Sequence, residues 1–300
     1  MDPFSAEGEL VKIHTAFIQG QYQSVLSDYD PSAFSPENKL PIQILQHRAQ
    51  CALGQYDQVL ESIPESDAKA TPDLAAMRTY ASFHKNPSAE SKSVEAAEQL
   101  AESAGDNLSV EILCGTILAR AGKQDQALQL LSRHQGSLDA VALIIQIHLA
   151  QNRTDLALKE AKAARSFAQD ALLVNLAESW IGVRQGGENY QKAFYVFEEL
   201  AQAPSSASAT SLIQQAVSEL HMGRVEEAET ALEQALALEP ENAQAVANKL
   251  VLDTILGKEG SELMGKLSQV DAEHEMLVDK KAKREAFQTA MAKYTPKFEP

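Results

Sequence analysis

Hydrophobic residues along this chain recur at the 3.6-residue spacing of amphipathic helices, in segments separated by short polar breaks. The clearest instance runs from Ala209 to Asn242. Gly223 interrupts it, where a helix end needs a residue that tolerates positive φ, and Pro240 follows its second half, where a helix cannot continue. The segment therefore predicts a pair of helices. The apolar positions of the first helix are Leu212, Ile213, Ala216, Val217 and Leu220.

Breaks of the same kind recur along the whole chain. Gly20-Gln21-Tyr22 and Gly54-Gln55-Tyr56 have identical residues and lie 34 positions apart. Counting on by the same interval reaches Ser88 and then Gly122. The later breaks are at Gln151-Asn152-Arg153, Gly186-Gly187-Glu188, Gly223 and Gly257. One helix pair cannot bury both of its apolar faces alone, so regular breaks predict pairs that stack on one another.

We therefore predict an all-α fold, an α-solenoid of tetratricopeptide-like helix pairs with a C-terminal capping helix. Ala209–Asn242 resembles one tetratricopeptide repeat in its small residues Ala216, Ala228 and Ala235, although Leu212 replaces a frequent aromatic and Gln215 a usual leucine. A single helical-repeat domain over 1–300 is expected, with repeats at approximately 6–39, 40–73, 74–107, 108–137, 138–173, 174–208, 209–242 and 243–272, and a capping helix at 273–295 that shields the last repeat.

Two regions fit the pattern weakly. The segment from Ser62 to Ser93 is polar and predicts an irregular or flexible repeat. The Ser/Ala-rich stretch from Pro204 to Thr210 predicts a loop.

The charge balance narrows the classes of partner. The net charge is −16, with 42 acidic and 26 basic residues, which disfavours nucleic acid because phosphate binding needs concentrated Lys and Arg. An anionic membrane surface would also repel this balance. The one basic cluster, Lys280 to Arg284, is interpreted as a solvated helix face.

Cysteine usage and hydropathy indicate the compartment. Cys51 and Cys114 both lie in apolar helical patterns, which favours buried reduced thiols and a reducing compartment. The N-terminus has neither a basic region nor an apolar core, and no run approaches ~18 apolar residues. We expect a soluble cytosolic protein without direct membrane insertion.

Residues for catalysis or ligand binding are not evident. Seven histidines lie far apart, and neither metal-ligand spacings nor phosphate-binding or nucleophile motifs occur. We therefore expect no enzymatic activity, no cofactor, no metal and no small-molecule substrate. A hydrolase hidden in an atypical repeat has no motif to support it.

A stack of helix pairs offers instead a concave groove lined by the first helix of each pair. Ile, Val and Leu at groove positions favour burial of an apolar segment of a partner protein, while core packing in a shifted register is the competing interpretation. Because these positions are mostly apolar, small or acidic, a clamp for a peptide's terminal carboxylate is disfavoured. The candidates are Ile112, Thr116, Arg120, Ala142, Gln146, Leu149, Glu178, Gly182, Ile213, Val217, Leu220, Ala247 and Val251.

The stretch from Asn175 to Leu200 closely resembles the epsilon-subunit family of coatomer. The resemblance rests on Asn175-Leu176-Ala177, Trp180, Gly186-Gly187-Glu188, Ala193, Tyr195, Phe197 and Glu199, and continues through Gly223-Arg224, Glu226 to Glu229, Leu250 to Leu252 and Leu256 to Lys258. It is strong over about 175–295 and looser, though collinear, from Phe4 to Ala168.

The resemblance implies a structural subunit of the COPI vesicle coat that acts in retrograde Golgi-to-ER and intra-Golgi transport. It also implies that the repeats embrace an arm of the C-terminal domain of alpha-COP, and that the protein is cytoplasmic and peripheral on Golgi membranes. Trp180 is interpreted as a core anchor between repeats rather than a partner contact. The alternative is a generic repeat adaptor or auxiliary subunit of another cytosolic complex.

Overall fold

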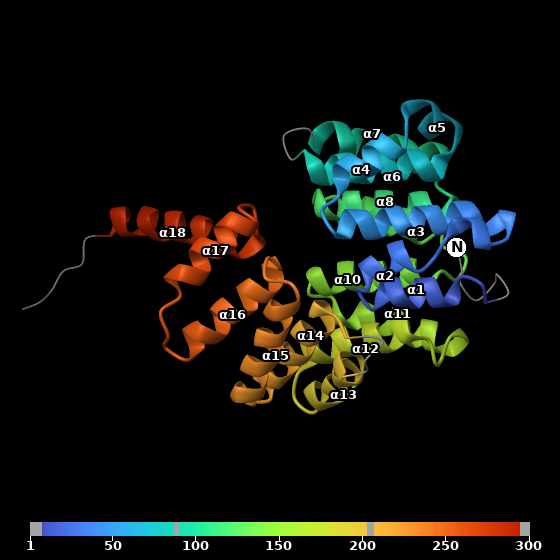
Figure 1. Ribbon diagram of the computed structural model, residues 1–300. Coiled ribbons are helices and arrows are strands. Elements are labelled where there is room, and N and C mark those ends of the chain that lie inside the picture. Colours follow the sequence, from blue (N-terminus) through green and yellow to red (C-terminus); the bar gives the residue numbers. More distant parts are fainter. Residues whose placement is uncertain (1–7, 87–89, 203–206, 295–300) are drawn as a thin grey trace, which may run out of the picture. The chain divides into compact units, whose positions relative to one another are not determined.

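The chain folds as two compact helical units. The computed structural model describes residues 8–86, 90–202 and 207–294, and no β-strand occurs within these ranges. Unit 1 covers Met1–Ala207 and unit 2 covers Ser208–Pro300 (Figure 1). The prediction of an all-α array of helix pairs is confirmed, whereas the assignment of one domain with eight numbered repeats stays a prediction.

Unit 1 contains the first thirteen α-helices and two short 3₁₀ helices. Their bounds are α1 (Val11–Ile18), α2 (Tyr22–Ser27), η1 (Pro31–Ala33), η2 (Pro36–Asn38), α3 (Lys39–Ala52), α4 (Tyr56–Ser62), α5 (Glu65–Ala70), α6 (Pro72–Lys85), α7 (Glu90–Ser103), α8 (Leu108–Arg120), α9 (Gln124–Leu131), α10 (Leu138–Ala150), α11 (Thr154–Phe167), α12 (Leu172–Gln185) and α13 (Asn189–Gln202). Unit 2 contains α14 (Ala209–His221), α15 (Val225–Leu238), α16 (Ala243–Ile255), α17 (Ser261–Val270) and α18 (Glu275–Lys293).

Successive helices pair and then stack, as the hydrophobic pattern predicts. In unit 1, α10 pairs with α11, α12 pairs with α13, and α10 and α11 both contact α12. In unit 2, α14 pairs with α15, and both contact α16. Small buried residues such as Ala157, Ala161 and Ala164 allow the helices to approach closely, so the core is built from many modest side chains.

The turns within the pairs explain the periodic glycines. Gly54 and Gly223 adopt φ values of 74° and 78°, a left-handed conformation that costs glycine little. Just beyond Gly223, the backbone N–H of Arg224 donates to the carbonyl of Glu219 at 2.9 Å, which closes the helix end. The break at Gln151-Asn152-Arg153 contains no glycine, and Asn152 adopts the left-handed conformation there, with φ 58°. Ser88 lies outside the described residues.

The weakly patterned regions differ in part from expectation. A short extra helix, α5, lies between α4 and α6 and packs Ala68 against the core. The described residues of the segment from Ser62 to Ser93 are therefore helical, and the irregularity is this additional helix between the paired ones. The predicted loop at Pro204–Thr210 ends earlier than expected, because α14 begins at Ala209 and Ser208 caps it. Residues 204–206 of that loop lie outside the described residues.

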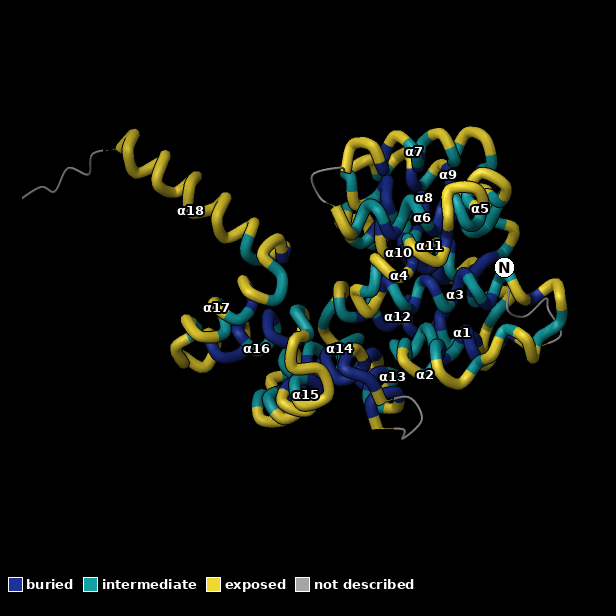
Figure 2. Tube along the Cα trace, turned by 45° about the horizontal axis from the view of Figure 1, so that its top comes forward, coloured by how far each residue is buried: buried dark blue, intermediate teal, exposed yellow. Residues whose placement is uncertain are grey.

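The predicted C-terminal helix is present, and its apolar contacts with the repeats come from its first turn. Met276 and Leu277 pack against a cluster that contains Val246, Ala247 and Leu267. The rest of α18 is exposed (Figure 2), including Phe287, and so is Tyr294 just after the helix. Shielding of the last pair is therefore confined to this first turn.

Both cysteines are buried free thiols in the same core cluster of unit 1. Burial raises the pKa of Cys51 and of Cys114 to about 12. Because the thiolate is the reactive form, both side chains act as small apolar core residues, as the sequence predicts.

A histidine sits within an aromatic cluster of unit 1. The ring of His84 lies 4.5 Å from that of Tyr80, 5.2 Å from that of Phe83 and 5.9 Å from that of Tyr56. Its Nε2 atom is buried without a hydrogen-bond partner. Burial, assisted by the nearby charge of Arg120, lowers the pKa of His84 to about 4, so the imidazole is neutral in the folded state at neutral pH.

Acidification should therefore destabilise unit 1. The unfolded chain protonates His84 near pH ~6.5, before the folded chain does, so stability is lost as the pH falls from about 6.5 to about 4. We expect the free energy of unfolding to fall by about 1–2 kcal/mol, a value reduced to allow for partial solvent access to His84. Urea unfolding followed by circular dichroism between pH 7.5 and 4.5 measures the loss. His84→Phe should flatten the profile, although His47, whose pKa burial also lowers, will retain part of the slope. His221→Gln, at an exposed position, is the control. If the pH dependence of the unfolding free energy were the same in His84→Phe as in this control, His84 would not be the group responsible.

Candidate partner-binding surface

The first helices of the two pairs in unit 2 carry apolar residues that are exposed on α16 and half-buried on α14. On α16, Val251 is 37% exposed and Ile255, one turn further on, is 61% exposed. Val217 of α14 occupies the position 34 residues before Val251 and is half-buried, as is Leu220. Helices α14 and α16 contact each other. We refer to Val217, Leu220, Val251 and Ile255 as the apolar strip.

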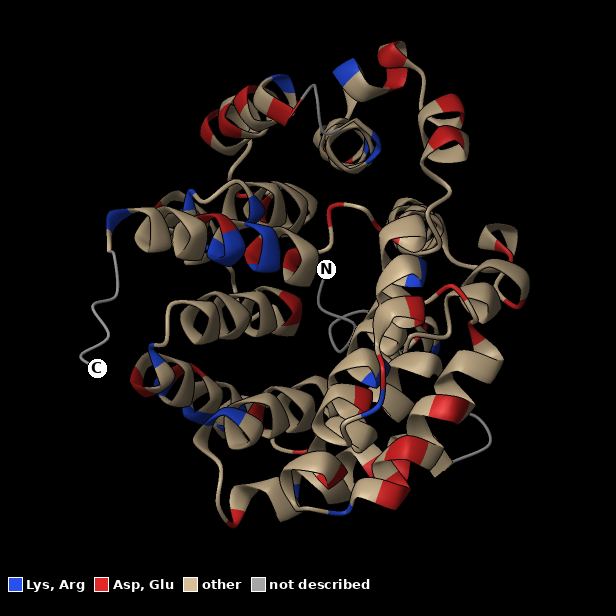
Figure 3. Ribbon diagram, turned by 90° about the vertical axis from the view of Figure 1, so that its left-hand side faces the viewer, with Lys and Arg blue, Asp and Glu red and all other residues tan. Residues whose placement is uncertain are grey.

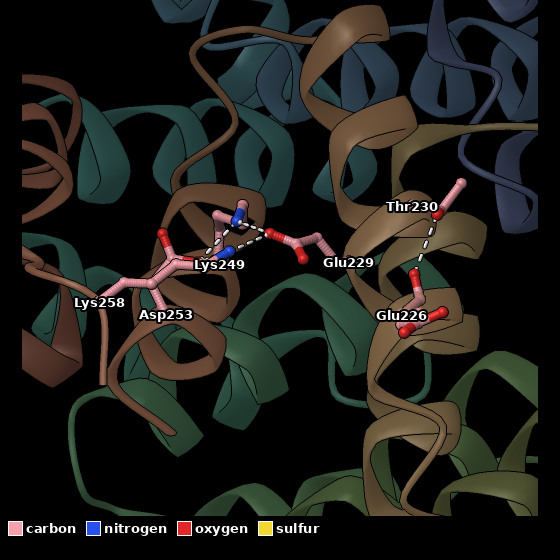
Figure 4. A network of polar contacts seen from close by, with 6 residues as sticks. All are labelled: Glu226, Glu229, Thr230, Lys249, Asp253 and Lys258. Atoms are coloured by element: carbon pink, nitrogen blue, oxygen red, sulfur yellow. Dashed lines mark hydrogen bonds and ion pairs between the residues drawn. The ribbon is translucent and has the colours of Figure 1, made fainter. Parts of the chain in front are cut away.

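An ionic network joins α16 to α15 (Figure 4). Lys249 donates to the carboxylates of Glu229 at 2.7 Å and Asp253 at 2.6 Å, and its side chain is only 12% exposed. Lys258 reaches the same Glu229 oxygen at 2.7 Å. Hydrogen bonds from Lys249 and then Lys258 lower the pKa of Glu229 to about 2, so its carboxylate stays charged across the physiological range. The network thereby helps to hold α16, which carries Val251 and Ile255, against α15.

Two other candidates in unit 2 lie in the interior. Ile213 is 8% exposed and Ala247 is 2% exposed, and Ala247 packs with Val246 and Leu267. The structure therefore places both in the packing between helices, which matches the competing interpretation of a shifted register.

Unit 1 closes on itself through its first helix. His14 of α1 contacts Asp139 of α10, with 2.6 Å between Nε2 and Oδ2, although the two residues are 125 positions apart. Arg48 of α3 donates to the other oxygen of Asp139 at 3.2 Å and lies over the ring of Phe17, 4.5 Å from its centroid. Burial alone would raise the pKa of Asp139, but His14 and Arg48 outweigh it and hold that pKa below its usual range.

Apolar contacts support the same closure. Ile18 at the end of α1 packs against two clusters, one built on Val141 and Ile181 and the other on Leu176 and Phe197. Trp180 packs against both clusters, so its predicted role as an anchor between repeats agrees with its position. The first helix pair therefore covers part of the α10–α12 face that the repeat pattern assigns to a groove.

The candidates on α8 and α10 have mixed surroundings. Ile112 lines a cavity of about 30 Å³ between α1, α3, α8 and α10, with room for about one water. Thr116 is half-buried and donates to the carbonyl of its own helix at Ile112. The other members lie as follows: Ala142 buried in the α10–α12 core, Leu149 half-buried against that core, and Gln146 and Arg120 exposed.

Glu178 and Gly182 do not face the same side as α1. They line a pocket between α11, α12 and α13, on the face that the second helices of the pairs flank. The Glu178 carboxylate accepts two hydrogen bonds from Arg165, at 2.6 Å and 2.7 Å. A Cβ at Gly182 would lie 3.3 Å from the backbone carbonyl oxygen of Asn189, so glycine there permits close packing of α12 on α13.

Sequence reasoning missed Ile255 and the closure by α1. Ile255 could have been found, because it lies four residues after Val251 and helical residues at that spacing share a face. The closure had no local signal, since its partners come from different helix pairs.

The surface of the described chain offers few concentrated features. Acidic residues are spread over most helices, whereas Lys280, Lys281, Lys283 and Arg284 gather on α18 (Figure 3). Within the described ranges, no group of three or more His, Cys, Asp or Glu side chains is arranged to hold a metal ion. No helix in the described part of the chain is both long and apolar enough to cross a membrane.

A sequence model described as the coatomer epsilon subunit matches residues 6–295. The chain belongs to the coatomer epsilon subunit family. Coatomer subunit epsilon-1 of Arabidopsis thaliana is 28% identical over 98% of this chain and 100% of its own length. The probable coatomer subunit epsilon of Schizosaccharomyces pombe is 31% identical over 84% of this chain and 83% of its own length. The coatomer subunit epsilon of Caenorhabditis elegans is 30% identical over 89% of this chain and 90% of its own length.

Solved structures resemble this coatomer epsilon family member in fold alone. A chain of the APC/C hetero-tetramer Cut9-Hcn1 matches with a TM-score of 0.60 and 14% identity, covering 92% of this chain and 55% of that one. A tetratricopeptide repeat protein from Parabacteroides merdae matches with a TM-score of 0.58 and 9% identity, covering 86% of this chain and 96% of that one. Both matches support the repeat fold.

Proposed function

We propose that this chain is a non-enzymatic structural subunit of the COPI coat that binds the C-terminal domain of alpha-COP through the apolar strip. Membership of the coatomer epsilon subunit family supports the coat role. In this proposal the subunit supports retrograde Golgi-to-ER and intra-Golgi transport, and it is cytoplasmic and peripheral on Golgi membranes through its coat partners.

The exposed apolar residues of α16 are the observation that carries the choice of surface. Val251 and Ile255 stand one turn apart with 37% and 61% of their surfaces open to solvent. Removal of such a pair from water on binding contributes favourable free energy without any polar group being left unpaired. The ionic network beneath keeps α16 in place, so little ordering is needed on association.

The remaining candidates differ in accessibility. Gln146 and Arg120 are open to a partner in unit 1, and Ile112, Thr116, Leu149 and Glu178 are half-buried. Partner contact at these positions stays a prediction. Ala142, Gly182, Ile213 and Ala247 are buried, so they would support the surface from within rather than touch a partner.

The double variant Val251→Asp/Ile255→Asp tests the strip. Two charges placed at the centre of an apolar contact should weaken binding at least about 30-fold, on the order of 2 kcal/mol. Calorimetric titration of the full-length chain with the purified C-terminal domain of alpha-COP measures the effect. Both positions are exposed, so far-UV circular dichroism and the thermal midpoint should stay as in the wild type.

Gln234→Asp/Ala237→Asp on the exposed side of α15 is the matched control, because it adds the same charge elsewhere in unit 2. It should bind as the wild type does. Equal affinities of the strip variant and this control would exclude the strip as the docking surface. Capture of chains other than coat subunits by the wild type, identified by mass spectrometry, would instead favour a generic adaptor.

A further inference from the structure

A half-open pocket lies between α11, α12 and α13 in unit 1, with a volume of about 280 Å³. Its floor is made of small or apolar residues, among them Ala161, Gly182 and Ala193. The hollow exists because these side chains are too short to fill the space between three helices. Pockets for drug-sized ligands run from about 300 to 1,000 Å³, so this one suits a single side chain with its backbone rather than a cofactor.

Cations surround the pocket, although the whole chain is strongly acidic. Lys162 of α11, Arg165 of α11 and Lys192 of α13 all line it. No carboxylate lies within ion-pair distance of Lys162 or Lys192 among the described residues, and both side chains are exposed. At physiological salt the screening length is about 8 Å, so these local charges outweigh the distant acidic ones for a group inside the pocket.

One anion already occupies part of this site. The Glu178 carboxylate takes two hydrogen bonds from Arg165, which also donates to the side-chain oxygen of Asn175 at 3.0 Å. The arrangement shows that the pocket holds a carboxylate in hydrogen-bonding geometry. A second carboxylate could be met by Lys162 and Lys192 without breaking this pair.

We infer that the pocket lined by Lys162, Arg165 and Lys192 binds the carboxylate side chain of an acidic, extended peptide segment of a partner protein. The apolar floor takes the methylene stem of a glutamate, and the two lysines take its carboxylate. Amide side chains of Gln185 and Asn189 at the edge can bond to the peptide backbone. The pocket belongs to unit 1, whereas the apolar strip belongs to unit 2, and none of the four strip residues lines the pocket, so the inference does not depend on the strip.

Fluorescence anisotropy with fluorescein-labelled hexaglutamate and the full-length protein, in 100 mM salt, tests the inference. Saturable binding is expected. Lys162→Glu/Lys192→Glu should weaken it at least about tenfold, because two attractive contacts become repulsive. Lys69→Glu/Lys92→Glu, which alters the net charge equally on exposed positions of α5 and α7, should change it less than twofold.

Glu178→Gln is a variant that should bind hexaglutamate more tightly than the wild type does. It removes the resident carboxylate and frees the Arg165 guanidinium, so the affinity for hexaglutamate should rise several-fold. Absence of saturable binding by the wild type, equal losses in the two double variants, or no gain with Glu178→Gln would each overturn the inference. The thermal unfolding midpoint of every variant should lie within about 3 °C of the wild-type value. The altered side chains are exposed or half-buried, so each change should alter the free energy of unfolding by about 1 kcal/mol or less.

Discussion

Asp139→Ala should lower the free energy of unfolding by about 3–5 kcal/mol, because it leaves the poorly solvated Arg48 guanidinium without its counter-charge and the His14 imidazole without its hydrogen-bond partner. The Asp139 side chain is 10% exposed, and its partners His14 and Arg48 are 11% and 19% exposed. Since the pKa of Asp139 is lowered on folding, the stabilisation is fully present at neutral pH, begins to fall near pH ~4, and is lost progressively toward the lowered pKa of the folded state. Urea unfolding measures the change.

The same variant should release α1 from α10. Amide hydrogen exchange should speed up over Val11–Ile18 before the rest of unit 1 is affected, because His14 and Ile18 are the residues that tie this helix to distant pairs. Asp155→Ala is the control: its ion pair with Arg153 is 53% and 66% exposed, so the loss should stay below about 1 kcal/mol. Equal losses in the two variants, or unaltered exchange in α1, would show that the closure contributes little.

Lys249→Met should destabilise unit 2 by about 2–3 kcal/mol. Methionine keeps the packing of the long apolar stem but removes the charge shared by Glu229 and Asp253. The Asp253 side chain is 12% exposed, so its carboxylate would lose its nearest partner in a poorly solvated position. The loss is expected below the range for a fully buried pair, because Lys258 still reaches Glu229 at 2.7 Å.

Hydrogen exchange over α15 and α16 of the full-length protein, together with urea unfolding, would report the effect of Lys249→Met. Lys283→Met removes an ion pair with Asp279 on α18 whose side chains are 76% and 55% exposed, and it should cost less than about 0.5 kcal/mol. If Lys249→Met proved no more harmful than Lys283→Met, the network would not be what holds α16 on α15.

The fold could be predicted from the sequence because the helix ends and buried faces depend on residues that are close together in the chain. The turn at Gly54 and the turn at Gly223 depend on a few neighbouring residues, so the breaks and their interval predict where the helices end. Apolar spacing then predicts which face of each helix is buried. The extra helix α5 escaped this reasoning because its polar residues carry little hydrophobic periodicity.

The candidate surface was predicted less completely. Val217 and Val251 could be named because equivalent positions in successive repeats face the same way. Glu178 was assigned to the groove, yet it turns toward α11 and pairs with Arg165. A small rotation of α12 decides between these two outcomes, and that rotation depends on packing against both neighbouring helices rather than on the residues of α12 alone.

The amino-acid sequence by itself determined the helix pairs, their period, the two buried thiols and the membership of the coatomer epsilon subunit family, because each depends on local spacing or on residue order. Only the tertiary structure decided that α1 returns to α10 through His14 and Asp139, that Lys249 joins α15 to α16, and that a cationic pocket opens between α11 and α13. These features bring together residues from different helices, and their meeting depends on how each helix is rotated and inclined against the next.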